Sequence, residues 1–213
     1  EALVPELHPI DKLLETKSVL SDYFWSAMYQ QKPIVAGGSV FKDEWWKFYT
    51  YLPQFEYRMI YADTAMKTGE KNDYSVFQCW GKTADNKVYL IDQIRGKWEA
   101  PQLLSNAKAF WAKHRGDSTS TLRQMKVEDK ASGTGLIQQL RQSGVPVAGI
   151  QRDKDKLTRA YDASPMVEVG NVYLPESKDF TTDLLTELTG FPVATHDDQV
   201  DPLMDAISDM LIG

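Results

Sequence analysis

The sequence predicts an α/β fold in which helices flank a mixed sheet. Three segments with strand character come first, and short turn-rich stretches join them into an antiparallel meander. Helices and strands then alternate to the end of the chain, an order that favours parallel connections. The length of 213 residues fits one large domain, or a medium domain with an appended segment.

The first 53 residues differ from the rest. A polar stretch with helical apolar spacing ends near Pro33, and a glycine pair and an aromatic cluster follow it. We interpret residues 1–53 as a connector packed on a domain at residues 54–213. The chain does not begin with Met, which suggests a processed chain or a piece of something longer.

The domain elements follow from local patterns. We expect strands at residues 56–63, 74–81 and 87–96, and a helix at residues 100–114. In the alternating half we expect strands at 123–129 and 145–150, helices at 133–144, 154–163 and 180–188, and a small hairpin at 167–175. A closing helix is expected at residues 199–212.

Composition excludes several classes of protein. Hydrophobic residues make up 42% and charged residues 25%, which is ordinary for a soluble globular protein. No apolar run approaches the roughly 18 residues of a spanning helix, so we expect a cytosolic protein with no membrane partner. Cys79 is the single cysteine, which excludes an internal disulfide and a multi-thiolate zinc site. The net charge of −6 is the opposite of a freestanding nucleic-acid binder.

The closing helix begins beside a cluster of carboxylates. Its predicted buried face comprises Val200, Leu203, Met204, Ile207 and Leu211. Pro202 then lies in the first turn, which places Asp197, Asp198 and Asp201 at the helix N-terminus. Capping and the helix dipole favour carboxylates there, so a simply capped helix is one interpretation of this cluster.

Two further acidic residues stand at predicted strand ends. Asp63 ends the first strand, and Glu128 lies at the end of the strand that begins the alternating half. If these strands are neighbours, the two carboxylates lie side by side, and the closing helix can deliver Asp198 to them. All-oxygen sites suit Mg²⁺ and Mn²⁺, and two such ions roughly 3.5–4 Å apart would promote phosphodiester hydrolysis.

A family resemblance strengthens this interpretation. The segments "IYADTA", "VEDKASGTGLIQQL", "QRDKDKLTRA", "VYLP" and "FPVATHDDQVDPLMDAI" occur in that order and resemble the nuclease half of the large terminase subunit of tailed double-stranded DNA bacteriophages. The earlier segment "LSDYFWSAMYQQKPIVAGGSVFKDEWWKFY" is similar to the family's connector between the ATPase and the nuclease. The resemblance implies an RNase H-like fold of the resolvase and integrase type, and a metal-dependent endonuclease that cuts concatemeric viral DNA during packaging.

The resemblance also implies site residues and partners. The family's acids fall on Asp63, Glu128 and the His-Asp-Asp motif, where we choose Asp198, with Asp197 close behind. Asp201 matches a further acid seen in related resolvases. The expected cofactors are two Mg²⁺ or Mn²⁺ ions. The expected partners are double-stranded DNA, an ATPase domain of the same polypeptide, the small terminase subunit and the capsid portal, in the cytoplasm of the host bacterium.

One short segment is basic. It contains Arg152, Lys154, Lys156 and Arg159, which the resemblance favours as DNA phosphate contacts. A solvated helix face paired with Asp153 and Asp155 is the other interpretation. The sequence lacks the G-x-x-x-x-G-K-[ST] phosphate loop, so we expect no ATPase activity from this chain.

Two other functions remain open at this point. Another RNase H-like nuclease, such as a junction resolvase, would prefer branched DNA and would not need the connector. A non-catalytic docking module of a packaging motor would use its acids only for capping and solubility.

Overall fold

The computed structural model describes residues 39–65, 74–117, 119–194 and 196–213. The helix predicted before Pro33 and most of the predicted connector lie outside these residues. One compact unit runs from Val40 to Gly213, and the following description concerns that unit.

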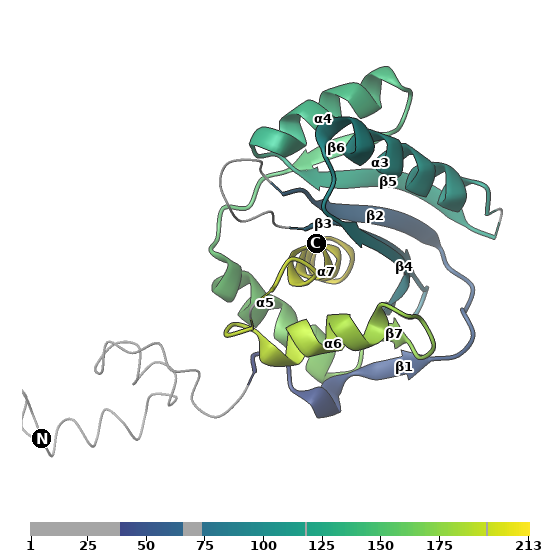
Figure 1. Cartoon of the computed structure of the whole chain (residues 1–213). Coiled ribbons are helices and arrows are strands. Elements are labelled where there is room, and N and C mark those ends of the chain that lie inside the picture. The colour runs from purple at the N-terminus through teal and green to yellow at the C-terminus, as the bar shows by residue number, and fades with distance from the viewer. Residues whose placement is uncertain (1–38, 66–73, 118, 195) are drawn as a thin grey trace, which may run out of the picture. The chain divides into compact units, whose positions relative to one another are not determined.

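A mixed sheet forms the centre of the unit (Figure 1). Among the described residues it has seven strands, in the spatial order β1-β7-β4-β3-β2-β5-β6. The strands are β1 (Lys47–Tyr49), β2 (Tyr57–Asp63), β3 (Ser75–Lys82), β4 (Val88–Gly96), β5 (Thr121–Glu128), β6 (Val147–Ile150) and β7 (Val172–Pro175). The β2–β3 and β3–β4 pairs are antiparallel, whereas β5 runs parallel to both β2 and β6. The predicted mixed sheet is therefore confirmed.

The hairpin predicted at residues 167–175 is wrong. Val167 is buried in the last turn of a helix, and Gly170 then adopts a positive φ of 81° that glycine tolerates at a helix end. Residues 172–175 form β7, which pairs in parallel with both β4 and β1 instead of folding back on a neighbour. Because β1 belongs to the sheet, the boundary predicted at residue 53 falls inside the compact unit.

Helices cover both faces of the sheet (Figure 1). One face is covered by α3 (Ala100–Arg115) and α4 (Ala131–Gln142), and the other by α5 (Lys156–Glu168), α6 (Thr181–Gly190) and α7 (Val200–Ile207). A short 3₁₀ turn, η1 (Asp43–Trp45), precedes β1. No helix of the described part of the chain is long and apolar enough to cross a bilayer.

Two apolar clusters lie between these layers. The cluster beneath α3 and α4 contains Cys79, which is fully buried. The other surrounds α7, whose Val200, Leu203 and Ile207 are fully buried against the sheet. The predicted closing helix continues past α7 as a π-helical turn, η2 (Ser208–Ile212). Its Asp209 accepts a hydrogen bond from the Tyr61 hydroxyl of β2 at 2.5 Å, which fixes the helix along the strand that ends in Asp63.

Candidate functional site

Two carboxylates meet at the end of neighbouring parallel strands. Ala62 of β2 is in register with Val127 of β5, so the next residues along each strand, Asp63 and Glu128, emerge at the same edge. The Asp63 and Glu128 carboxyls are linked by a hydrogen bond. The side-by-side placement expected from the sequence is therefore present.

The first two turns of α7 bring Asp201 and Asp205 toward the same place. Both side chains are largely buried, with 7% and 5% of their surface exposed. Asp198 faces elsewhere: its Oδ2 lies 3.3 Å from Nη2 of Arg95, on β4. Asp201, and not Asp198, is therefore the acid of this cluster that joins the strand-end carboxylates in the structure.

Arg152, the second residue after β6, lies at the centre of the cluster, and its side chain is 6% exposed. Its Nη1 is 3.2 Å from Asp63 Oδ1 and 3.0 Å from Glu128 Oε2. The same nitrogen is 3.5 Å from Asp201 Oδ1, while Nη2 is 2.7 Å from Asp205 Oδ2. One guanidinium therefore contacts carboxylates from β2, β5 and α7.

The other predicted DNA contacts are also ion-paired. Lys156 Nζ lies 2.8 Å from Asp197 Oδ1 and 2.6 Å from Asp201 Oδ2. Arg159 pairs with Asp201 and, through Nη1 at 3.2 Å, with Asp205. Lys154 pairs at 2.6 Å with Asp162, on the exposed side of α5. Arg152, Lys156 and Arg159 thus act as counter-ions of the acidic cluster in this structure.

The charge states of the acids follow from these contacts. Burial, reinforced by Asp201 and Glu128 and opposed by Arg152, raises the pKa of Asp63 to about 7. Burial also acts on Glu128, but Lys130 and Arg152 hold the pKa of that carboxyl below its usual value. In the same way Arg152, Lys156 and Arg159 outweigh burial and lower the pKa of Asp201. Asp63 is therefore the member of the pair that keeps a proton, and it donates the hydrogen bond to the Glu128 carboxylate.

The donor set suits a hard divalent cation, because every ligand offered is a carboxylate oxygen. Within the described part of the chain, no three acidic, histidine or cysteine side chains are spaced to hold a metal ion. The carboxylates of Asp63, Glu128 and Asp201 are instead gathered around the Arg152 guanidinium. The chemistry of the donors fits Mg²⁺ or Mn²⁺, while their spacing fits an arginine.

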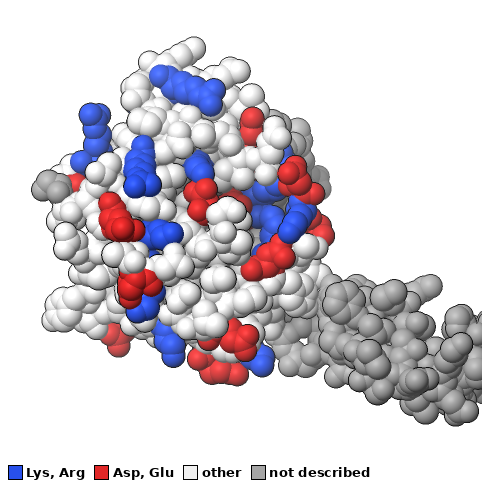
Figure 2. Space-filling view, turned by 180° about the vertical axis from the view of Figure 1, so that it is seen from behind, with Lys and Arg blue, Asp and Glu red and all other residues white. Residues whose placement is uncertain are grey.

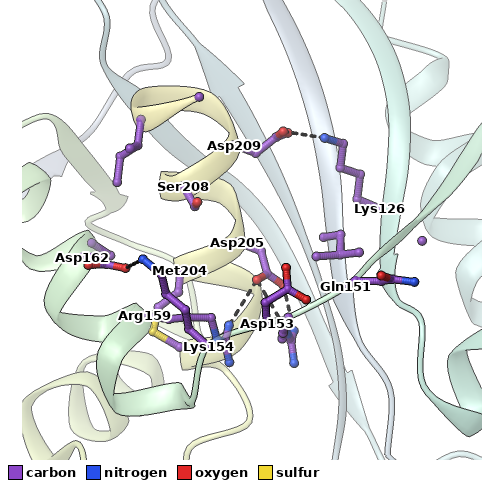
Figure 3. Close-up of a pocket in the computed structure, with 16 residues that line it drawn as sticks. Lys126, Gln151, Asp153, Lys154, Arg159, Asp162, Met204, Asp205, Ser208 and Asp209 are labelled. Atoms are coloured by element: carbon purple, nitrogen blue, oxygen red, sulfur yellow. Dashed lines mark hydrogen bonds and ion pairs between the residues drawn. The ribbon is translucent and has the colours of Figure 1, made fainter.

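A cavity of about 430 Å³ adjoins the cluster between α5, α7 and the ends of β5 and β6. Figure 3 shows Asp205 pointing from α7 toward Arg159 of α5, while Lys126 and Asp209 form an ion pair on the far side. Arg152 and Asp205 both line this cavity. Solvent therefore has a route to the acidic cluster from this side.

Buried glutamines fix where α7 begins. Gln93 Nε2 donates to Gln199 Oε1 at 2.5 Å, and Gln78 Nε2 donates to the Gln199 carbonyl at 3.0 Å. The backbone N–H of Gln199 donates in turn to the Glu187 carboxylate of α6 at 3.1 Å. Glu187 also forms an ion pair with Arg95 at 2.7 Å. These contacts lock the residues just before Asp201 against β3, β4 and α6.

Sequence reasoning missed Asp205. Asp201 and Asp205 stand four residues apart, which puts both on one helix face, and this spacing is the signal that would have found the second acid. No local pattern marks the buried glutamines, since their partners come from three separate elements.

The surface carries no broad basic stripe on the face seen in Figure 2, where Lys and Arg alternate with Asp and Glu. This interleaving agrees with the overall net charge of −6.

Three solved structures illustrate the fold similarity. The large terminase of the thermophilic bacteriophage D6E matches with a TM-score of 0.64 and 14% identity, over 96% of this chain and 53% of that one. The large terminase nuclease of thermophilic phage G20c, with bound magnesium, matches with a TM-score of 0.57 and 18% identity, over 81% and 98% of the two chains. The P22 large terminase nuclease domain matches with a TM-score of 0.56 and 14% identity, over 83% and 93%.

These structures share the fold of this chain, and the chain spans about half the length of the D6E protein (53%). A search of the curated proteins found no match. The family model of the terminase RNaseH-like domain matches residues 60–209, which contain Asp63, Glu128, Asp201 and Asp205. Because that match covers well over half of the sequence, the chain belongs to the terminase RNaseH-like domain family.

Proposed function

We propose that this chain is a divalent-metal-dependent DNA endonuclease that cuts concatemeric double-stranded viral DNA during genome packaging. The observation that carries the proposal is the convergence of Asp63, Glu128 and Asp201 at one edge of an RNase H-like sheet. Three buried carboxylates from three elements repel one another unless a cation lies among them. Family membership and the magnesium, zinc and cobalt bound to the G20c nuclease are consistent with a metal in that role.

Asp63, Glu128 and Asp201 would hold the ion or ions. A bound Mg²⁺ or Mn²⁺ supplies Lewis-acid stabilisation of the phosphate and lowers the pKa of attacking water, most fully as a pair of ions. Asp63 must first lose its proton, because a carboxylic acid is a poor metal ligand. Lys156 and Arg159 keep Asp201 ionised and fix its orientation.

The wider setting is proposed from the family. The partners are double-stranded DNA, an ATPase domain in the same polypeptide, the small terminase subunit and the capsid portal, in the host bacterial cytoplasm. The D6E large terminase was solved in complex with ADP, in agreement with a nucleotide-binding part in that longer protein. We propose that such a part lies outside residues 60–209, which match only the RNaseH-like domain.

A plasmid digest tests this function. The purified chain should nick and linearise supercoiled plasmid with Mg²⁺ or Mn²⁺ and leave it intact with EDTA. Asp63→Asn should abolish cleavage while circular dichroism shows an unchanged fold, and Asp162→Asn, at the exposed Lys154 pair, should cut normally.

Two results would reject the proposal. No cleavage under any metal condition would favour a non-catalytic docking module. Cleavage confined to four-way junctions, with plasmid and linear duplex untouched, would identify a resolvase-type nuclease instead.

A further inference from the structure

Arg152 divides its contacts between two sets of carboxylates. Its Nη2 and Nε contact Asp205, at 2.7 Å from Oδ2 and 3.4 Å from Oδ1. Its Nη1 faces the other set, Asp63, Glu128 and Asp201, at 3.0 to 3.5 Å. The guanidinium is therefore anchored on one edge and reaches the proposed metal ligands with a single nitrogen.

That nitrogen and a metal ion compete for the same oxygens. Nη1 lies 3.0 to 3.5 Å from one oxygen of each of the three carboxylates, and a Mg²⁺ ion bound by the same three oxygens, at about 2.0–2.1 Å from each, would lie among them as Nη1 now does. A Mg²⁺ ion and a guanidinium in contact with the same oxygens repel each other strongly when both are shielded from water. The arginine and the ion therefore cannot occupy the centre of the three carboxylates together.

We propose that Arg152 is an internal counter-ion that holds the three carboxylates together before metal binds, and that its Nη1 is displaced when the metal enters. Asp205 keeps the side chain attached through Nε and Nη2 during the exchange. Arg152 is thus a positioning residue for the proposed metal centre. This inference rests on the proposed function and specifies how the same site is regulated by metal.

The surroundings leave room for the exchange. Arg152 lines the cavity of about 430 Å³ beside the cluster, together with Gln151 and Asp153. In Figure 3 Asp205 faces this cavity, so a guanidinium that pivots on Asp205 moves toward open space. Arg159 contacts both Asp201 and Asp205, so α7 keeps a positive partner after Nη1 leaves.

Calorimetric titration of Mn²⁺ into the metal-free chain tests the competition. Arg152→Gln removes the competing charge, so Mn²⁺ should bind at least about tenfold more tightly than to the native chain, a gain of about 1.4 kcal/mol. The same variant should melt at a lower temperature without metal, since its carboxylates lose their counter-ion, and should gain more from added Mn²⁺. Lys154→Gln, which removes a lysine of the same segment paired with exposed Asp162, is the matched control and should bind Mn²⁺ within about twofold of the native chain.

A second measurement follows Arg152 in the native chain. In protein labelled with ¹⁵N-arginine, the Arg152 Nε–H signal should shift during a Mg²⁺ titration and saturate with the binding isotherm. Its identity follows from its absence in Arg152→Lys. The Arg58 signal, from a buried arginine bonded to residues 114, 117 and 120, should not move.

The outcomes separate this inference from the function. The exchange is overturned if Arg152→Gln binds Mn²⁺ no more tightly than the native chain, or if the Arg152 Nε–H signal does not shift during the Mg²⁺ titration. Plasmid cleavage by the native chain would still support the nuclease proposal in that case. If Arg152→Gln binds Mn²⁺ and the native chain does not, the result supports the exchange, because the arginine then excludes the ion completely. If neither chain binds metal and the native chain does not cut plasmid, both proposals fail.

Discussion

Asp63 is the residue whose charge depends most on its neighbours. Its pKa is about 7, against 3.8 for an exposed aspartate, because burial and the adjacent carboxylates oppose ionisation more than Arg152 favours it. Between those two values the folded chain keeps a proton that the unfolded chain has lost. Rising pH therefore destabilises the metal-free fold through this residue across that window, and above it the effect is complete.

Asp63→Asn should remove this pH dependence. The free energy of unfolding of the native chain in EDTA should fall by about 2 kcal/mol more than that of the variant between pH 5 and pH 7, since one pKa unit corresponds to about 1.4 kcal/mol. Urea unfolding at the two pH values measures the difference. Asp162→Asn, an exposed acid, should follow the native chain, and parallel curves for Asp63→Asn and the native chain would contradict the assigned pKa.

At the scale of elements, Arg58 of β2 fixes the connection between α3 and β5. Its side chain is 1% exposed and donates to the carbonyls of His114, Asp117 and Ser120, at 3.0, 2.7 and 2.6 Å. Further bonds reach Ser120 Oγ and Asp117 Oδ2. The loop that leads into the strand carrying Glu128 is thus held by one guanidinium.

Arg58→Met should lower the free energy of unfolding by about 3 kcal/mol, because it leaves several loop carbonyls without a donor while roughly preserving the buried volume. Arg123→Met, which removes only an exposed guanidinium 3.6 Å from the Tyr57 ring, should cost less than about 1 kcal/mol. Urea unfolding followed by circular dichroism compares the two. Equal losses would mean that the Arg58 contacts do not hold the loop.

Local sequence patterns predicted the helices and strands better than they predicted which of these elements contact one another. Alternation and turn residues located β2, β3 and β4, and helical spacing located α3, α5 and α6, because these signals lie within one segment. The hairpin prediction at residues 167–175 was wrong, because a short stretch of β-branched residues does not indicate whether a strand pairs with its neighbour in sequence or with distant strands. β7 finds its partners at β1 and β4, far away in sequence.

The same limit applies to the site. Spacing placed Asp197, Asp198 and Asp201 at a helix N-terminus, but which one faces Asp63 and Glu128 is set by the buried glutamines and by Arg95. The prediction that Arg152 contacts DNA rests on its basic segment and on the family resemblance of that segment. Its carboxylate partners include Asp63, which is 89 residues away in the chain, and no local signal reports that contact.

At the scale of the whole molecule, the fold concentrates negative charge at one edge of the sheet and neutralises it from within. Arg152, Lys156 and Arg159 lie among the acids, and Figure 2 shows mixed charge, not a basic stripe, on the face it presents. Weak, sequence-independent DNA binding is the expected consequence for a chain of net charge −6.

The most direct test of the account compares two isosteric variants three residues apart. With Mg²⁺ and supercoiled plasmid, Asp201→Asn should slow cleavage by about a hundredfold or more, because it removes the negative charge of one of the three carboxylates proposed to hold the catalytic ion. Asp198→Asn, which faces Arg95, should stay within about tenfold of the native rate, with both folds verified by circular dichroism. The reverse order, with Asp198→Asn inactive and Asp201→Asn active, would contradict the site described for this chain.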